Sequence, residues 1–186
     1  MLVSEAQREV RLTFLGGFPG QLVSGVLWLL SAALGSAGRI RLAMLTLVVG
    51  GMFIFPLTML LLRAMRRPAA LSASNPLGGL AMQIAFTIPL SLPLVGAATL
   101  HHQNWFYPAF MVVVGAHYVP FMFLYGMWSF GVLAGLLIGG GVWIGLAMPT
   151  CFTVGGWTTG VVLVLFAFVG LAIARREQAS GAAASR

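Results

Sequence analysis

The chain has 186 residues, of which 60% are hydrophobic and 7% are charged, and its formal net charge is +7 at pH 7. Soluble domains carry about a quarter charged residues, so this composition excludes a soluble enzyme, a disordered chain and a nucleic-acid-binding domain. The charge comes from ten Arg against three Glu, with no Lys and no Asp, and the charges flank apolar runs, which is typical of an integral membrane protein.

Residues 1–15 predict a short amphipathic helix on the membrane surface. Ser4-Glu5-Ala6-Gln7 has the form of a capping box in which Ser4 begins the helix. Apolar residues recur at helical spacing up to Phe14, and Gly16-Gly17 and Pro19 then interrupt the pattern. A helix of this kind lies in the lipid interface with its apolar face buried.

Six apolar stretches follow, and each is long enough to cross a bilayer, which takes about 20 residues. None contains Asp, Glu, Lys or Arg, and their continuous apolar character favours helices over the alternating strands of a membrane barrel. The sequence therefore predicts an all-α fold, a polytopic transmembrane helical bundle that forms one domain over residues 1–186. Its six spans, within 17–174, are 17–37, 42–62, 77–100, 105–125, 128–148 and 154–174.

The arginines predict the orientation of this bundle. With six spans, two arginines, Arg39 and Arg41, fall on one side of the membrane. The other eight fall on the side of the termini, and the positive-inside bias therefore places both termini in the cytoplasm. Residues 31–37 are similar to a signal-peptide cleavage region. The apolar run 12–34 is longer than the usual core of about 7–15 residues, so we expect a retained first helix, with cleavage as the alternative.

The connections are predicted to be short. The longest internal loop covers residues 63–75, where Asn75 is expected to cap the third span with Pro76 in its first turn. The Ala/Ser/Gly-rich tail, 178–186, is expected to be disordered.

Neutral polar residues inside the spans are the candidate binding groups, because no carboxylate lies there. His117 is the one histidine near the middle of a predicted span. Pro120, three residues later, has no N–H and cannot donate a hydrogen bond to the carbonyl of Ala116. A kink and an unsatisfied acceptor beside an imidazole would build a polar cavity. The other interpretation is a neutral His117 that is hydrogen-bonded to a neighbouring helix.

Several of these polar groups fall at similar depth in the predicted bundle. Two glutamines in lipid would be costly, so both are expected to face the protein interior, and the tyrosines of the fourth span share one helix face. We expect them to bind substrate in a pocket that opens towards the cytoplasm, although interhelical hydrogen bonds would also explain them. The predicted substrate-binding residues are Gln21, Gln83, His117, Tyr118 and Tyr125.

No metal, cofactor or catalytic residue is predicted. His101 and His102 lack a third ligand, the methionines form no tight copper-binding cluster, and Cys151 has no base nearby in the sequence. Glycine stripes such as Gly131, Gly135 and Gly139 predict close helix packing, either within the chain or between copies.

Four segments carry a family resemblance: residues 16–25 (GGFPGQLVSG), 51–58 (GMFIFPLT), 75–77 (NPL) and 106–128 (FYPAFMVVVGAHYVPFMFLYGMW). With these the chain resembles an uncharacterised family of small six-helix bacterial membrane proteins. The resemblance implies a compact helical fold in the bacterial inner membrane and no catalytic or binding residue.

The sequence favours a carrier or channel for a small neutral or weakly polar solute. One alternative is a structural or accessory subunit of a larger membrane complex. Another, less supported, is a membrane-embedded enzyme that uses His117 with Tyr118 as acid or base. The expected partners are the lipid bilayer, a small solute, and a homo-oligomer or a larger complex, and no nucleic acid.

Overall fold

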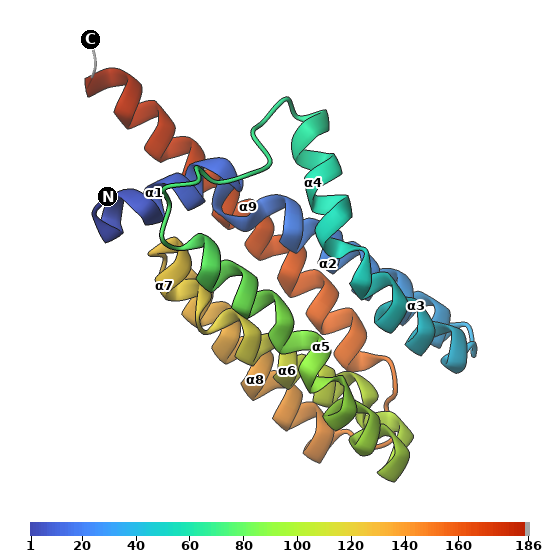
Figure 1. Ribbon diagram of the computed structural model, residues 1–186. Coiled ribbons are helices and arrows are strands. Elements are labelled where there is room, and N and C mark those ends of the chain that lie inside the picture. Colours follow the sequence, from blue (N-terminus) through green and yellow to red (C-terminus); the bar gives the residue numbers. More distant parts are fainter. Residues whose placement is uncertain (185–186) are drawn as a thin grey trace.

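The computed structural model describes residues 1–184, which form nine α-helices and two short 3₁₀ turns without a strand (Figure 1). The predicted all-helical fold is therefore confirmed. Five helical stretches are each long and apolar enough to cross a membrane, and a bent helix pair would make a sixth span. The chain is an integral membrane protein.

Helix α1 (Val3–Thr13) is the predicted N-terminal helix. Its N-cap is Leu2 and not Ser4, so the predicted cap is wrong. Glu5 nevertheless acts as the second half of a capping box would, since its carboxylate accepts a hydrogen bond from the Leu2 N–H at 2.8 Å. Ala6 and Val10 are fully buried, so the apolar face of α1 packs on the bundle.

A tight turn joins α1 to the first span. The 3₁₀ turn η1 (Leu15–Gly17) holds three consecutive residues at positive φ, of 49°, 64° and 86°. Gly16 and Gly17 adopt this left-handed conformation without a Cβ clash. Helix α2 (Phe18–Ser36) then begins with Pro19 in its first turn, as its fixed φ favours.

The second predicted span is two helices, α3 (Ile40–Met52) and α4 (Ile54–Ala64), which meet at an angle of 59°. Pro56 explains the break because it cannot donate to the carbonyl of Met52, and Gly50-Gly51 weakens the helix just before it. The predicted span over 42–62 is therefore a bent pair of helices.

The next spans run close to the predicted boundaries. Helix α5 (Gly78–His101) leads through η2 (Gln103–Trp105) to α6 (Phe106–Tyr118) and the short α7 (Phe121–Tyr125), and α8 (Ser129–Ala147) follows. Asn75 does not cap α5, whose N-cap is Leu77. The Asn75 Oδ1 accepts a hydrogen bond from the Leu77 N–H at 2.9 Å in the turn before the helix.

Helix α9 (Val154–Ala184) is longer than predicted. Disorder over 178–186 is wrong for residues 178–184, which continue the helix, and 185–186 lie outside the described residues. Two contacts hold the extension, one between Glu177 and Arg11 and one from the Arg67 guanidinium to the Gln178 side chain at 3.1 Å. Alanine and glutamine are good helix formers, so the tail lengthens the helix once these contacts fix its start.

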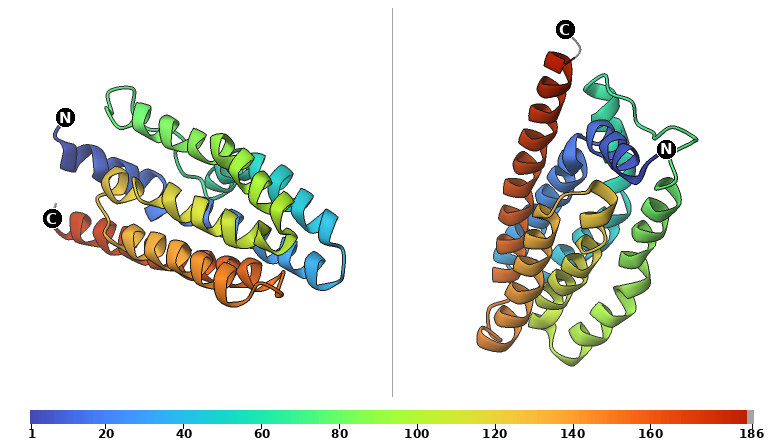
Figure 2. Two further views of the ribbon diagram at one scale, coloured as in Figure 1. Left: turned by 90° about the horizontal axis from the view of Figure 1, so that it is seen from below. Right: turned by 90° about the vertical axis from the view of Figure 1, so that its left-hand side faces the viewer.

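The helices pack as two antiparallel pairs, α2 with α9 and α6 with α8, and α9 also contacts α6 and α8. Helices α3 and α4 lie against α2, whereas α5 lies on the outside against α6 (Figures 1 and 2). Glycines let the members of each pair approach, since a Cβ at Gly25 would meet Val164 and one at Gly115 would meet Ala134 and Ile138.

Both termini lie at one end of the bundle, together with α1, α7 and the end of α4 (Figure 1). We call this the terminal end, and the end that holds η2 and the α8–α9 connection the opposite end. The arginine-rich segments 63–67 and 175–176 also belong to the terminal end, as the segregation of arginines predicts.

Candidate binding site

One face of α2 points at α6 and the segment after it. Its residues recur at spacings of four and three, and all are buried: Gly17, Gln21, Ser24, Trp28 and Ser31. Two contacts fix the direction of this face. The Trp28 ring lies 5.4 Å from the Phe110 ring, and a Cβ at Gly17 would lie 3.8 Å from the Tyr125 ring. Lower numbers on α2 therefore face higher numbers on α6 and α7, as in an antiparallel pair.

Towards the opposite end, the polar groups of this interface are paired. The Ser31 hydroxyl donates to the Ala43 carbonyl at 2.8 Å, so the Tyr107 hydroxyl, 2.6 Å away, must donate to Ser31. Ser31 and Tyr107 are both fully buried. This half of the interface is a closed hydrogen-bonded contact among α2, α3 and α6, and it serves packing.

Towards the terminal end, the same interface holds an unpaired group. Gln21 is only 4% exposed, and its Oε1 is a buried atom with no hydrogen-bond partner. Because Gln21 lies between Gly17 and Trp28, it is level with the part of α6 that carries Tyr118. An unsatisfied buried acceptor costs about 1–3 kcal/mol. A hydrogen-bond donor from outside the chain would therefore bind favourably to Gln21.

Aromatic rings pack beside Gly17, one helical turn before Gln21. The Phe130 ring contacts Tyr118 and Tyr125, with ring centroids 5.9 and 4.9 Å apart, and a Cβ at Gly17 would lie 3.1 Å from it. Helical side chains lean towards the helix N-terminus, so Gln21 leans from α2 towards Gly17 and these rings. Tyr118 and Tyr125 are each 6% exposed. The site therefore combines one amide with two buried tyrosines.

His117 lies at a different interface, between α6 and α5. The Thr87 hydroxyl gives its hydrogen to the Ile84 carbonyl at 2.7 Å, so the Nδ1–H of His117 is the donor to Thr87 Oγ1 at 2.8 Å. This is the interhelical hydrogen bond that was the second interpretation of His117. The His117 and Tyr118 rings are 5.7 Å apart, but their polar groups serve different interfaces.

Gln83 lies one helical turn before Thr87 on α5, and its side chain is exposed. The five predicted residues therefore form two groups. Gln21 lies on the face of α2 that points towards α6 and α7, which carry Tyr118 and Tyr125, whereas Gln83 lies on α5 and His117 contacts α5. The spacing of 17, 21, 24, 28 and 31 was a usable signal for the first group. Phe130, which joins the two tyrosines, carried no signal in the sequence.

Pro120 separates α6 from α7, where a kink was predicted. The carbonyl of Ala116 is not left unsatisfied, because it accepts a hydrogen bond from the Val119 N–H at 3.2 Å. The expected free acceptor beside His117 is therefore wrong. A tighter final turn satisfies the carbonyl, as is common at helix ends.

One family model matches the chain, over residues 3–173, and its description is Family of unknown function (DUF7010). The chain belongs to this family. No curated protein and no solved structure gave a match. The resemblance of the four sequence segments to an uncharacterised membrane-protein family is thereby confirmed.

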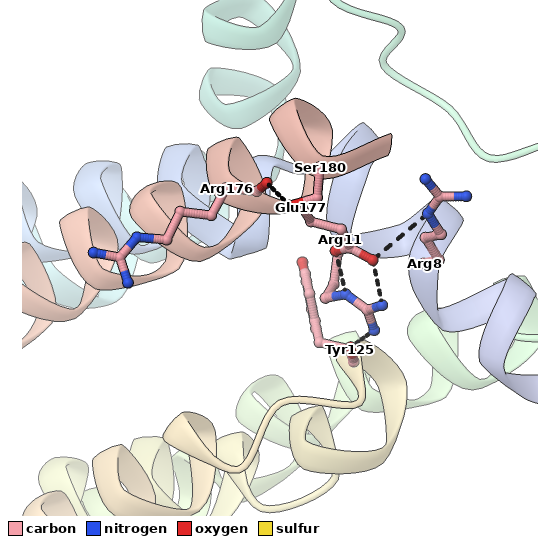
Figure 3. A network of polar contacts seen from close by, with 6 residues as sticks. All are labelled: Arg8, Arg11, Tyr125, Arg176, Glu177 and Ser180. Carbon is pink, nitrogen blue, oxygen red and sulfur yellow. Dashed lines mark hydrogen bonds and ion pairs between the residues drawn. The ribbon is translucent and has the colours of Figure 1, made fainter. Parts of the chain in front are cut away.

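In this DUF7010 chain, helix α1 packs at the terminal end beside Tyr125 and is held there by hydrogen bonds of Arg11. The Arg11 guanidinium donates to both oxygens of Glu177 at 2.8 Å and to the Tyr125 carbonyl at 2.7 Å (Figure 3). Arg8 approaches the same carboxylate at 3.6 Å. The hydrogen bonds with Glu177 raise the pKa of Arg11 above its ordinary value, so this ion pair stays charged. Arg11 thus links α1 and α9 to the backbone of Tyr125.

A second contact fixes α1 to the loop before α5. Glu9 accepts hydrogen bonds from the Ser72 hydroxyl at 3.0 Å and from the Asn75 side chain at 2.9 Å, and also from the Ser72 N–H. The bond from the Ser72 N–H and then that from Asn75 lower the pKa of Glu9 below its ordinary value. Asn75 also donates to the Ala6 carbonyl at 3.2 Å, so this DUF7010 protein holds α1 in place from two sides.

Among the described residues of this DUF7010 chain, no group of three or more His, Cys, Asp or Glu is placed to hold a metal ion. The rings of His101 and His102 lie 5.8 and 6.3 Å from that of Trp105. Cys151 is exposed in the connection between α8 and α9.

Proposed function

We propose that this protein is a carrier or channel for a small neutral or weakly polar solute in a bacterial inner membrane, with both termini in the cytoplasm. The solute binds between α2 and α6–α7, where Gln21 accepts a hydrogen bond from it. The observation that carries the proposal is the buried Oε1 of Gln21, which has no partner within the protein.

The chemistry of the site supports a neutral solute. Its polar groups are one carboxamide and the hydroxyls of two tyrosines, and none of these is charged at neutral pH. The nearest guanidinium, that of Arg11, is engaged by Glu177 and by the Tyr125 carbonyl. A charged solute would therefore enter an apolar region without a counter-ion, which is costly. A small solute with an N–H or O–H donor would instead pair with Gln21.

Two breaks in the helices are the proposed moving parts. Residues 119–120 separate α6 from α7, and Phe53 separates α3 from α4 at the 59° bend. Tyr125 on α7 contacts Phe130 and is tied to α1 through Arg11. Movement of α7 together with α1 would therefore change the access to Gln21 from the terminal end.

Reconstituted vesicles test this function. The purified protein is placed in liposomes, and stopped-flow light scattering follows the entry of water, glycerol, urea and formamide as separate probes. We expect at least one probe to enter faster than in empty vesicles, and Gln21→Leu to lower that protein-dependent rate at least tenfold, because leucine cannot accept the hydrogen bond.

Gln103→Leu is the matched control, because Gln103 is exposed at the opposite end and the same substitution there should leave the rate unchanged. A rate that Gln21→Leu does not alter, in a variant that still folds, would contradict the proposal. It would favour the alternative of a structural or accessory subunit, which needs no ligand at Gln21.

A further inference from the structure

Helix α5 has the least covered surface of the long helices in the described part of the chain. It packs mainly on α6 (Figure 2). Only Ile84 and Val95 within it are buried. Its outer side carries residues at spacings of four, three, four, four and three, and each of them is exposed: Gly79, Gln83, Phe86, Leu90, Leu94 and Ala97. We call this row the α5 seam.

The α5 seam forms one continuous stripe along the helix. Its members recur every 3.6 positions on average, which is the period of an α-helix, so the stripe stays on one side of α5 and can lie along a second helix. The large members of the row face away from the bundle, since Phe86, Leu90 and Leu94 are 57%, 76% and 70% exposed. Pro89 and Pro93 fall outside the row.

Gln83 is the polar residue of the seam, and it lies at membrane depth. It is six to seven residues from the middle of α5, or about 10 Å along the axis. A hydrocarbon core of about 30 Å extends about 15 Å from its centre. An exposed carboxamide at this depth faces lipid, which offers it no hydrogen bond, so a polar partner there is favoured.

We propose that the α5 seam binds the α5 seam of a second copy of this chain, with the two Gln83 side chains hydrogen-bonded to each other. A carboxamide has both donors and an acceptor, so two of them satisfy each other. A twofold axis normal to the membrane places both at the same depth without further adjustment. Helix α5 carries no Asp, Glu, Lys or Arg, so no charge on it calls for a different, oppositely charged partner.

The hydroxyl of the neighbouring Thr87 does not compete for Gln83. It donates to the Ile84 carbonyl and accepts from His117. This α5–α6 contact also holds the seam helix against the bundle. The proposal does not rest on solute binding at Gln21, which is a buried residue of α2, and either can fail while the other stands.

Subunit counting in lipid tests the pairing. The labelled full chain is diluted in phosphatidylcholine–phosphatidylglycerol vesicles, and single-molecule photobleaching measures the dimer fraction against protein density. We expect a monomer–dimer equilibrium that Gln83→Leu weakens by about threefold to eighteenfold, as expected for interhelical hydrogen bonds in membranes of about 0.6–1.7 kcal/mol. Gln103→Leu should leave it unchanged. Monomers at all densities, or equal dimerisation of wild type and Gln83→Leu, would overturn the proposal.

Cysteine cross-linking tests the face. In a Cys151→Ser background, oxidation should join two copies through Leu90→Cys or Leu94→Cys. Ala85→Cys is the control, since this exposed position lies on the other flank of α5, and it should cross-link at least tenfold less. Equal yields at Leu90→Cys and Ala85→Cys would show association without the seam and would also overturn the proposal. Folding is checked by circular dichroism for each variant.

Discussion

Two glycine backbones touch where the first turn meets the last helix. A Cβ built on Gly170 would overlap the carbonyl oxygen of Gly16, and one built on Gly16 would overlap that of Gly170. Gly16 also has a φ of 64°, which L side chains adopt at a cost. The contact brings η1 onto α9 and so fixes where α1 leaves the bundle and where α2 begins.

This contact predicts a strong effect of a single methyl group. Gly170→Ala should lower the free energy of unfolding by about 1–3 kcal/mol or more, because backbone atoms must shift to admit it. Gly135→Ala is the control. No atom lies within 4 Å of its added Cβ, and alanine in an open helical position stabilises by about 0.5–1 kcal/mol. Unfolding in mixed micelles with increasing SDS, followed by circular dichroism, measures both, and equal effects would contradict the packing.

Among elements, α1 makes contacts that its amphipathic pattern does not reveal. Its residues Ala6 and Val10 pack on protein, Val3 is exposed, and its polar residues bind three other segments. Glu9 binds the loop before α5, Arg11 binds α9 and α7, and the Gln7 amide donates to the Phe123 carbonyl. Helix α1 is therefore a strap across the terminal end, beside the tyrosines of the candidate site.

The strap depends on the fork geometry of Arg11. Arg11→Lys keeps the charge but loses the two parallel hydrogen bonds to Glu177. The Arg11 and Glu177 side chains are only 16% and 25% exposed. We therefore expect the opening free energy of α1 to fall by about 1–2 kcal/mol, measured by amide hydrogen exchange in detergent or nanodiscs.

Arg8→Lys is the matched control for this strap. The Arg8 side chain is 52% exposed and 3.6 Å from the same carboxylate, a geometry in which an ion pair contributes little. Its exchange should match that of the wild type. Unchanged exchange of α1 in Arg11→Lys would show that apolar packing of Ala6 and Val10, and not the fork, holds the strap.

The boundaries of most spans followed from composition because a membrane helix must be apolar over its whole length. The differences from the predicted spans have one local and one tertiary cause. Pro56 bends the second span, and contacts of Glu177 and Gln178 with distant arginines continue α9 where an isolated tail would be disordered. The latter is a tertiary effect that no local pattern carries.

At the scale of the molecule, the sequence could list the polar residues but not sort them. The faces of a lipid-spanning helix are all largely apolar, so hydrophobic periodicity does not reveal which face points inwards, and only on α2 does the spacing of polar residues help. Gln21 and Gln83 looked alike in sequence, yet Gln21 is 4% exposed and faces α6, whereas Gln83 is exposed on α5. Gln21 is buried inside the bundle and Gln83 is exposed outside it, and this division suggests a solute site inside the chain and a contact between copies outside it.

The native cysteine tests how the whole molecule sits in the membrane. Cys151 is the one cysteine of the chain and is exposed at the opposite end, at the start of α9. If both termini are cytoplasmic, a membrane-impermeant maleimide added to right-side-out vesicles should label Cys151. In a Cys151→Ser background, Ser180→Cys, exposed near the other end of α9, should be labelled only after the vesicles are opened. The reverse pattern would invert the proposed orientation. Labelling of both sites from the same side would mean that α9 does not cross the membrane, and this would contradict the six-span topology.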